Sequence, residues 1–204
     1  MKQYQPVFAF LIGVGVAFGA GSLLTGKHHH GHLHEGSHPV GYAEHEDEVH
    51  VHSDFVVSIA GETIDLSDDR FMTSSTQTLH PHIHLHDNNG NIIHRHEHDI
   101  TLGAFFESLG FPLTNDCITT EAGVEYCTND KQALLLFVNG VVTPSIADYV
   151  NQEEDQLLVY YGSPNAPEIP ELLEAVSDES CVYSGTCPER GVAPPESCGL
   201  TCEL

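Results

Sequence analysis

Histidine recurs at every second position on both sides of a short polar segment, in the stretch LHPHIHLHDNNGNIIHRHEHD at residues 79–99. Neutral imidazole is a borderline ligand that suits Zn, Cu, Ni and Fe, and several imidazoles on one rigid element can share an ion. The histidines of this stretch are His80, His82, His84, His86, His94, His96 and His98. The spacing therefore predicts transition-metal binding, with a Zn or Cu ion as the expected cofactor.

A β-hairpin would position these histidines. A period of two places side chains on one face of a strand, and Asn-Gly between apolar runs is a hairpin signal. We expect a three-residue loop, Asn88–Gly90, with Gly90 in the left-handed conformation and Asp87 opposite Asn91. A two-residue loop would instead place the two histidine sets on opposite faces.

The three-residue loop predicts which histidines face each other. Directly opposed Cβ atoms lie about 5 Å apart, a distance from which two imidazoles reach one ion. The expected pairs are His84 with His94, His82 with His96, and His80 with His98. We therefore predict a two-by-two metal patch formed by His82, His84, His94 and His96, with His80, His86 and His98 around it.

Further histidines lie upstream. His50 and His52 occupy a predicted strand whose apolar residues have odd numbers, so they point to the opposite face and could join the patch from a neighbouring strand. Asp54, Asp87 and Asp99 could complete or orient the ligand shell. A polar linker carries His28, His29, His30, His32, His34, His38 and His45. We expect it to collect metal weakly, because a disordered chain must lose conformational entropy around an ion.

Other patterns predict the elements around the hairpin. Residues 49–66 indicate a hairpin with an Ala60–Gly61 turn. Residues 101–110 predict a helix with Thr101 as N-cap and Gly110 as its stop. ALLLFVNGVV predicts a buried strand with an Asn139–Gly140 turn, SIADYV a helical turn, and DQLLVYYG a last strand. The fold class expected from this order is α+β.

Six cysteines all lie after residue 116. An even number in an exported chain indicates disulfides. Residues 116–130 predict a hairpin in which Cys117 lies opposite Cys127, and we expect a bridge between them. The tail contains Cys181, Cys187, Cys198 and Cys202, for which we expect two further bridges.

The N-terminal region predicts a location for the protein. Residues 7–24 are uncharged and apolar, a length that can cross a bilayer, although a cleaved signal peptide remains the alternative. We expect a single-pass cell-membrane protein with its C-terminal domain outside the cytoplasm. The expected segments are an anchor at 1–27, a His-rich disordered linker at 28–48, a metal-binding domain at 49–162 and a Cys-rich tail at 163–204. A formal charge of −24 excludes a basic nucleic-acid-binding face.

Two resemblances extend these expectations. The segment LFVNGVVTPSIADYVNQEEDQLLVYYG resembles the β-grasp (ubiquitin-like) fold and is similar to small sulfur carriers, which implies a β-grasp-like mixed sheet with one main helix and hairpin insertions. The carriers end in a Gly-Gly thiocarboxylate, whereas here Gly162 is followed by about forty more residues. The carrier activity is therefore not expected.

The second resemblance rests on five motifs that follow one another behind the predicted anchor. The motifs HSDF, HLHDNNGNIIH, TLGAFFESLG, TNDC and CPERGVAPP resemble an uncharacterised, membrane-anchored, His-rich exported protein of reduced-genome bacteria. Members are sometimes labelled protein-disulfide isomerase, which would imply thiol–disulfide exchange. This chain has no C-x-x-C motif.

Three functions therefore remain open. The first is metal sequestration or delivery outside the cytoplasm by the His-rich hairpin. The second is an extracellular interaction module with a pH-sensitive histidine surface and an unidentified protein partner. The third is a metal-dependent or thiol–disulfide enzyme, for which the sequence shows no catalytic residues.

Overall fold

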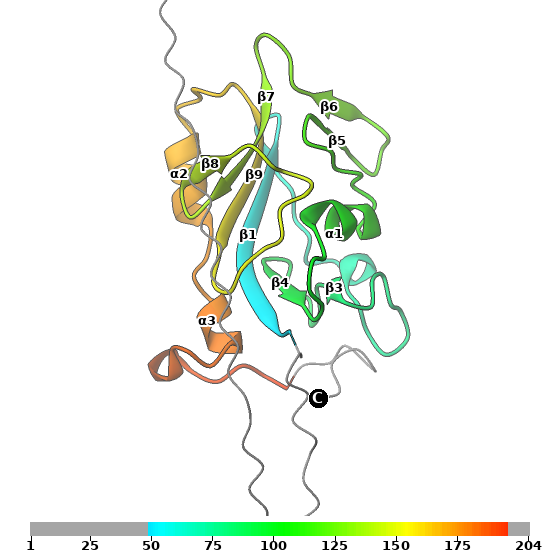
Figure 1. Cartoon of the computed structure of the whole chain (residues 1–204), viewed down its shortest axis with the longest axis vertical. Helices are drawn as coiled ribbons and strands as arrows, with labels where there is room; N and C mark the ends of the chain where they lie inside the picture. The colour runs from blue at the N-terminus through cyan, green and yellow to red at the C-terminus, as the bar shows by residue number, and fades with distance from the viewer. Residues whose placement is uncertain (1–48, 196–204) are drawn as a thin grey trace, which may run out of the picture. The chain divides into compact units, whose positions relative to one another are not determined.

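The strand β1 (Val51–Ile59) carries a different kind of residue on each face. Phe55 and Val57 are buried in the main hydrophobic core, whereas His52 and Asp54 are buried on the opposite face. The computed structural model describes residues 49–195, and β1 lies in the middle of their central sheet (Figure 1). The alternation along this strand therefore separates the apolar core from the histidines.

The central sheet has seven strands and is mixed. β1 pairs in parallel with β9 (Gln156–Gly162), and the other pairings are antiparallel. The order is β3-β4-β1-β9-β7-β8, with β2 paired to β1 outside this path. The remaining strands are β2 (Glu62–Thr63), β3 (Ile83–His84), β4 (Ile92–Arg95), β7 (Ala133–Val138) and β8 (Val141–Thr143). Together with the helices, this sheet confirms the expected α+β class.

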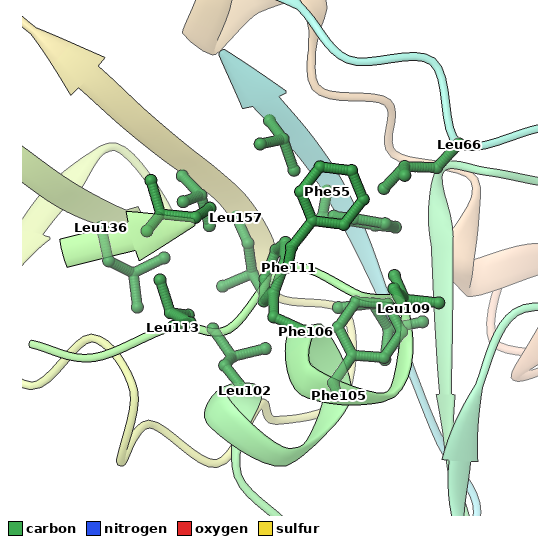
Figure 2. Close-up of a cluster of buried hydrophobic side chains, with 14 of the residues drawn as sticks. Phe55, Leu66, Leu102, Phe105, Phe106, Leu109, Phe111, Leu113, Leu136 and Leu157 are labelled. Carbon is green, nitrogen blue, oxygen red and sulfur yellow. The ribbon is translucent and has the colours of Figure 1, made fainter. Parts of the chain in front are cut away.

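Helix α1 (Leu102–Ser108) covers the apolar face of the sheet. Thr101 caps its N-terminus by accepting a hydrogen bond from the backbone N–H of Ala104, and Gly110 ends the segment with a φ of 85°. Figure 2 shows Phe105 and Phe106 of this helix packed near Phe55 of β1. Burial of each such side chain contributes about 1.5–3 kcal/mol. The predicted helix and both of its ends are confirmed.

A two-stranded hairpin lies beside α1. It pairs β5 (Cys117–Thr119) with β6 (Glu125–Cys127), and Cys117 lies opposite Cys127. A disulfide joins the two cysteines, as predicted. The Thr120 N–H donates to the Val124 carbonyl across a three-residue loop, 121–123, in which Gly123 has a φ of 75°.

The residues after β9 return across the opposite face of the sheet. Helix α2 (Ile169–Ala175) packs on a small apolar cluster that includes Leu158 and Tyr160 of β9. The short helix α3 (Ser180–Tyr183) follows, and Figure 1 shows both helices on the side of the sheet away from α1. A 3-10 turn, η2 (Pro188–Arg190), comes after α3, and a similar turn, η1 (Asp69–Phe71), precedes β3.

The tail contains one of the two disulfides expected there. It joins Cys181 and Cys187 and closes a short turn after α3. Cys198 and Cys202 lie outside the described residues, as do the predicted membrane span and the His-rich linker. Within residues 49–195, no helix is long and apolar enough to cross a bilayer.

The predicted hairpin loop is wrong, although its register is confirmed. His84 pairs with His94 as expected, but the strands separate after this pair. The turn falls at Asp87 and Asn88, with φ of 56° and 58°, and closes with the Asn89 N–H bonded to the His86 carbonyl. Leu85 instead bridges to Met72, because its apolar side chain is fully buried in the core. The expected pairing of Asp87 with Asn91 is absent from this described loop.

Gly90 is required for close packing and does not adopt the predicted left-handed conformation. A Cβ atom at this position would lie 2.5 Å from the backbone carbonyl carbon of Leu66 and 2.6 Å from the backbone nitrogen of Ser67. Backbone atoms cannot move aside as a flexible side chain can. The loop therefore packs directly on the segment after β2.

We predict that Gly90→Ala lowers the free energy of unfolding by about 1–3 kcal/mol, as overpacking does. Gly61→Ala is the control, because no atom lies within 4 Å of the added methyl there and only the backbone conformation opposes it. Urea-induced unfolding measures both variants. A Gly90→Ala protein as stable as the wild type would contradict the close approach.

Candidate metal centre

Three neighbouring strands bring histidines to one face of the sheet. β4 is the middle strand, and its His94 lies opposite His84 of β3 and His52 of β1. The next row contains His96, whose backbone N–H bonds to the carbonyl of His82 and whose ring contacts His50. Because β4 pairs with both neighbours in register, the period of two in each strand becomes a two-dimensional patch.

Six imidazole rings form one cluster, which we call the histidine cluster. Its members are His50, His52, His84, His86, His94 and His96. Successive ring centroids lie 4.7 Å apart from His94 to His52, 4.6 Å from His52 to His50, 4.6 Å from His50 to His96 and 5.0 Å from His96 to His84. The ring of His86 adjoins that of His94 at 3.8 Å.

One group within the cluster has the geometry closest to an ion site. Each of His50, His52 and His94 offers a ring nitrogen, and the three nitrogens lie within 4.8 Å of one another. Zinc–nitrogen bonds of about 2.0–2.1 Å in a tetrahedral site separate neighbouring nitrogens by about 3.3 Å. Rotations of the rings are needed to bring the three nitrogens to such distances. His86 and His96, whose rings adjoin those of His94 and His50, are the candidates for a fourth ligand.

The Nδ1 atoms of two cluster histidines are held by acceptors. His86 Nδ1 lies 2.8 Å from a carboxylate oxygen of Asp87, and His84 Nδ1 lies 3.3 Å from the backbone carbonyl oxygen of His80. Both oxygens can only accept, so Nδ1 donates in each ring. In neutral imidazole the lone pair is then on Nε2. Metal-binding histidines characteristically donate their other ring N–H to a carboxylate or a carbonyl in this way.

The ring of His52 is held from the tail. Its Nδ1 lies 2.9 Å from the Ser184 hydroxyl oxygen, and this hydroxyl donates to the Glu153 carboxylate. Tyr183 lies over the same part of the cluster, with its ring centroid 5.2 Å from that of His94 and 5.8 Å from that of His52. The Tyr183 hydroxyl accepts a hydrogen bond from the side chain of Asn89. The disulfide-closed turn therefore covers one side of the histidine cluster.

Burial distinguishes the cluster from the remaining predicted ligands. His52, His84, His86 and His94 are each at most 1% exposed. Among the other predicted ligands, His82 and His98 are exposed and His80 is half-buried. The structure brings six of the nine predicted metal ligands together and leaves His80, His82 and His98 outside the cluster.

His80 has a structural contact of its own. Its Nδ1 accepts hydrogen bonds from the backbone N–H groups of His82 and Ile83. Burial, with a smaller contribution from the charge of His82, lowers the pKa of His80. A lowered pKa keeps Nδ1 unprotonated, which is the form that can accept these bonds. The predicted pairing of His80 with His98 does not occur, because β3 begins after His80 and β4 ends before His98.

The predicted acidic residues have different surroundings. Asp87 orients His86, whereas Asp99 is exposed in a turn after β4. Asp54 is fully buried and holds the tail: its carboxylate accepts from the Ser177 hydroxyl and from the backbone N–H groups of Glu179 and Ser180. A second group with ligand spacing, Cys117, Glu125 and Cys127, contains a disulfide, so its sulfurs are not thiolates.

Sequence reasoning missed the residues that the tail contributes. Ser184, Tyr183 and Glu153 are ordinary residues of a polar chain, and no periodic pattern marks them. Their separation from His52 in the sequence reaches 132 residues. The Cys181–Cys187 spacing was the available signal, because a short disulfide turn can hold nearby side chains in place.

No family model, no curated protein and no solved structure matches the chain.

We predict that Asp54→Asn releases α3 from the sheet, because an amide cannot replace a carboxylate that accepts three hydrogen bonds, each worth about 1.5–3 kcal/mol when charged. Hydrogen exchange at residues 179–186 should accelerate while exchange in α1 stays slow. Asp178→Asn is the matched control, since Asp178 is an exposed neighbour that pairs with Arg190. Unchanged protection of α3 in Asp54→Asn would contradict this anchoring role.

Proposed function

We propose that the protein binds a transition-metal ion, Zn or Cu, in the histidine cluster, and that it sequesters or delivers this ion. The observation that supports the proposal most is the convergence of ring nitrogens from His50, His52 and His94 within 4.8 Å. Imidazole suits both metals, with zinc favouring a tetrahedral and copper(II) a flatter arrangement.

The Nδ1 contacts of the cluster are a second support. His52 on β1, His84 on β3 and His86 in the loop after β3 donate Nδ1–H to a hydroxyl, a carbonyl and a carboxylate, so the three Nε2 atoms carry the lone pairs. A sheet holds these rings in place before an ion arrives, which lowers the conformational entropy lost on binding. The chain also carries a strong negative charge, which raises the local concentration of cations.

Burial favours metal binding over a histidine-lined interaction surface. A pH-sensitive surface needs imidazoles that a partner protein can touch, and four of the six cluster histidines are almost fully buried. His82 and His98 are exposed and could serve such a surface. An enzyme needs an open coordination position and a base, and the cover formed by Tyr183 argues for storage of an ion rather than turnover.

We also infer a β-grasp-like topology and a membrane-anchored location outside the cytoplasm. The fold inference is supported by the hairpin β1–β2, the helix α1 on the apolar face of the sheet, and the parallel pairing of β1 with β9. The location inference is supported by the apolar residues 7–24 and by the two disulfides.

We predict that the full chain, purified without an affinity tag, binds Zn(II) or Cu(II) tightly and stoichiometrically. Replacing His52 and His94 together with Gln should abolish this tight site, because it removes two of the three convergent nitrogens. Calorimetric titration with each metal measures the effect. The matched control replaces His82 and His98 with Gln, since both are exposed outside the cluster, and it should retain the tight site.

Deletion of residues 28–45 separates the cluster from the linker in the same titration. The deletion should remove only weak sites. If it abolishes tight binding while the His52 and His94 replacements leave it intact, the linker is the site and the proposal is wrong.

A second prediction concerns pH. Protons compete with metal for imidazole nitrogen, and histidine ordinarily titrates near pH 6.5. Affinity for Zn(II) should therefore be greatest above about pH 7 and should fall progressively as the pH decreases through about 6. Titrations between pH 5.5 and 8 measure this dependence. A constant affinity over this range would show that imidazoles are not the ligands.

A further inference from the structure

The tail places one hydroxyl group between a cluster histidine and a carboxylate. Ser184 directly follows α3, and its Oγ lies 2.9 Å from Nδ1 of His52. The same hydroxyl donates to the side chain of Glu153, the residue whose other carboxylate oxygen accepts a bond of 3.4 Å from the His52 backbone N–H. These contacts form a chain from imidazole to hydroxyl to carboxylate.

The chemistry of this chain allows one arrangement of protons. A carboxylate can only accept, so the single proton of the Ser184 hydroxyl is directed to Glu153. The lone pairs of Oγ then face His52, and Nδ1 must be the nitrogen that carries hydrogen. In neutral His52 the lone pair is consequently on Nε2. Glu153 thus determines the tautomer of a ring it reaches through Ser184.

We propose that Ser184 and Glu153 are positioning residues that fix His52 in the Nδ1–H tautomer and present Nε2 as a metal ligand. The role of Nε2 as a metal ligand rests on the proposed function, whereas the tautomer of His52 follows from the hydrogen bonds alone. His84 and His86 are held in the same way, by the backbone carbonyl of His80 and by the carboxylate of Asp87. Ser184 and Glu153 provide the corresponding support for His52 on β1. His52 receives its support from a segment far along the sequence.

Several contacts hold Ser184 at the required place. The Asp54 carboxylate fixes the start of the segment through Ser180 and its neighbours. The disulfide Cys181–Cys187 closes the turn around Ser184. Thr186 donates to Glu154, the residue next to Glu153, and so docks the far end of the turn. The hydroxyl is therefore fixed from both sides before any ion binds.

The test compares Ser184→Ala with Thr186→Ala in the full chain. Both variants remove one hydroxyl from the same turn, and both lose one hydrogen bond to an acidic residue of the 153–154 pair. Thr186 is the matched control because its hydroxyl bonds to Glu154 and to the Cys181 carbonyl, whereas that of Ser184 contacts a histidine.

Two measurements are needed. Long-range proton–nitrogen NMR spectra of the metal-free chain at pH 8 report the tautomer of His52. Competition between the chain and a chelating dye for Zn(II) reports its affinity. Ser184→Ala should shift His52 away from Nδ1–H and weaken Zn(II) binding about 10- to 100-fold, as loss of such supporting contacts does. Thr186→Ala should leave the tautomer unchanged and have the smaller effect on affinity.

Two further variants guard against misfolding of Ser184→Ala. Ser184→Thr keeps the hydroxyl and should retain both the wild-type tautomer of His52 and the wild-type affinity for Zn(II). Glu153→Gln should shift the tautomer in part, because an amide can donate to Oγ as well as accept from it. If the tautomer is unchanged in Ser184→Ala and in Glu153→Gln, or if Thr186→Ala weakens Zn(II) binding as much as Ser184→Ala, the positioning role is wrong.

Failure of the proposed function would look different. A wild-type chain that binds no Zn(II) but shows the Nδ1–H tautomer, lost in Ser184→Ala, would refute metal binding and support the hydrogen-bonded chain. A wild-type His52 in the Nε2–H tautomer would overturn the inference whether or not Zn(II) binds.

Discussion

A carboxylate buried in the sheet constrains the rest of this structure. Asp54 lies in the middle of β1 with none of its surface exposed, and an ionised carboxylate in such a place is costly unless hydrogen bonds surround it. The donors come from the tail, at Ser177, Glu179 and Ser180. The tail must therefore return to β1, and α3 must start where the backbone N–H groups can reach the carboxylate.

The position of α3 determines the surroundings of the histidine cluster. Asp54 and His52 are two residues apart and share one face of β1. A segment anchored at Asp54 thus extends over His52, which brings Tyr183 and Ser184 onto the cluster. Asp54, which anchors the tail, and His52, a proposed metal ligand, are consequently linked by the two-residue period of one strand.

Local patterns predicted much of this arrangement. The alternation in β1, the Ala60–Gly61 and Asn139–Gly140 turns, the N-cap at Thr101 and the Cys117–Cys127 pairing depend on residues close in sequence, and each agrees with the structure. The register of His84 with His94 was also predicted. The strand period places the histidines on one face, whereas the register was predicted from a loop that has another conformation in the structure.

The remainder depends on contacts between distant segments. The loop after His86 differs from the prediction because Leu85 forms a parallel bridge with Met72, and the rules for hairpin loops do not consider such a contact with another segment. The placement of β4 against β1 decides that His50 and His52 belong to the centre of the cluster and that His82 does not. Tertiary packing thus determines which histidines belong to the cluster, and the sequence of the hairpin alone does not indicate it.

The parallel pairing of β1 with β9, and the return of the tail to β1, also have a kinetic consequence. The disulfide hairpin joins residues 10 apart, whereas the contact of His52 with Ser184 spans 132 residues. Closing the longer loop costs about 2 kcal/mol more chain entropy. High contact order makes such steps slow, so the strands that carry the histidines can pair before the tail covers them. Until α3 docks, the face of the sheet that carries the histidines is open to solvent, and the last segment to fold covers it.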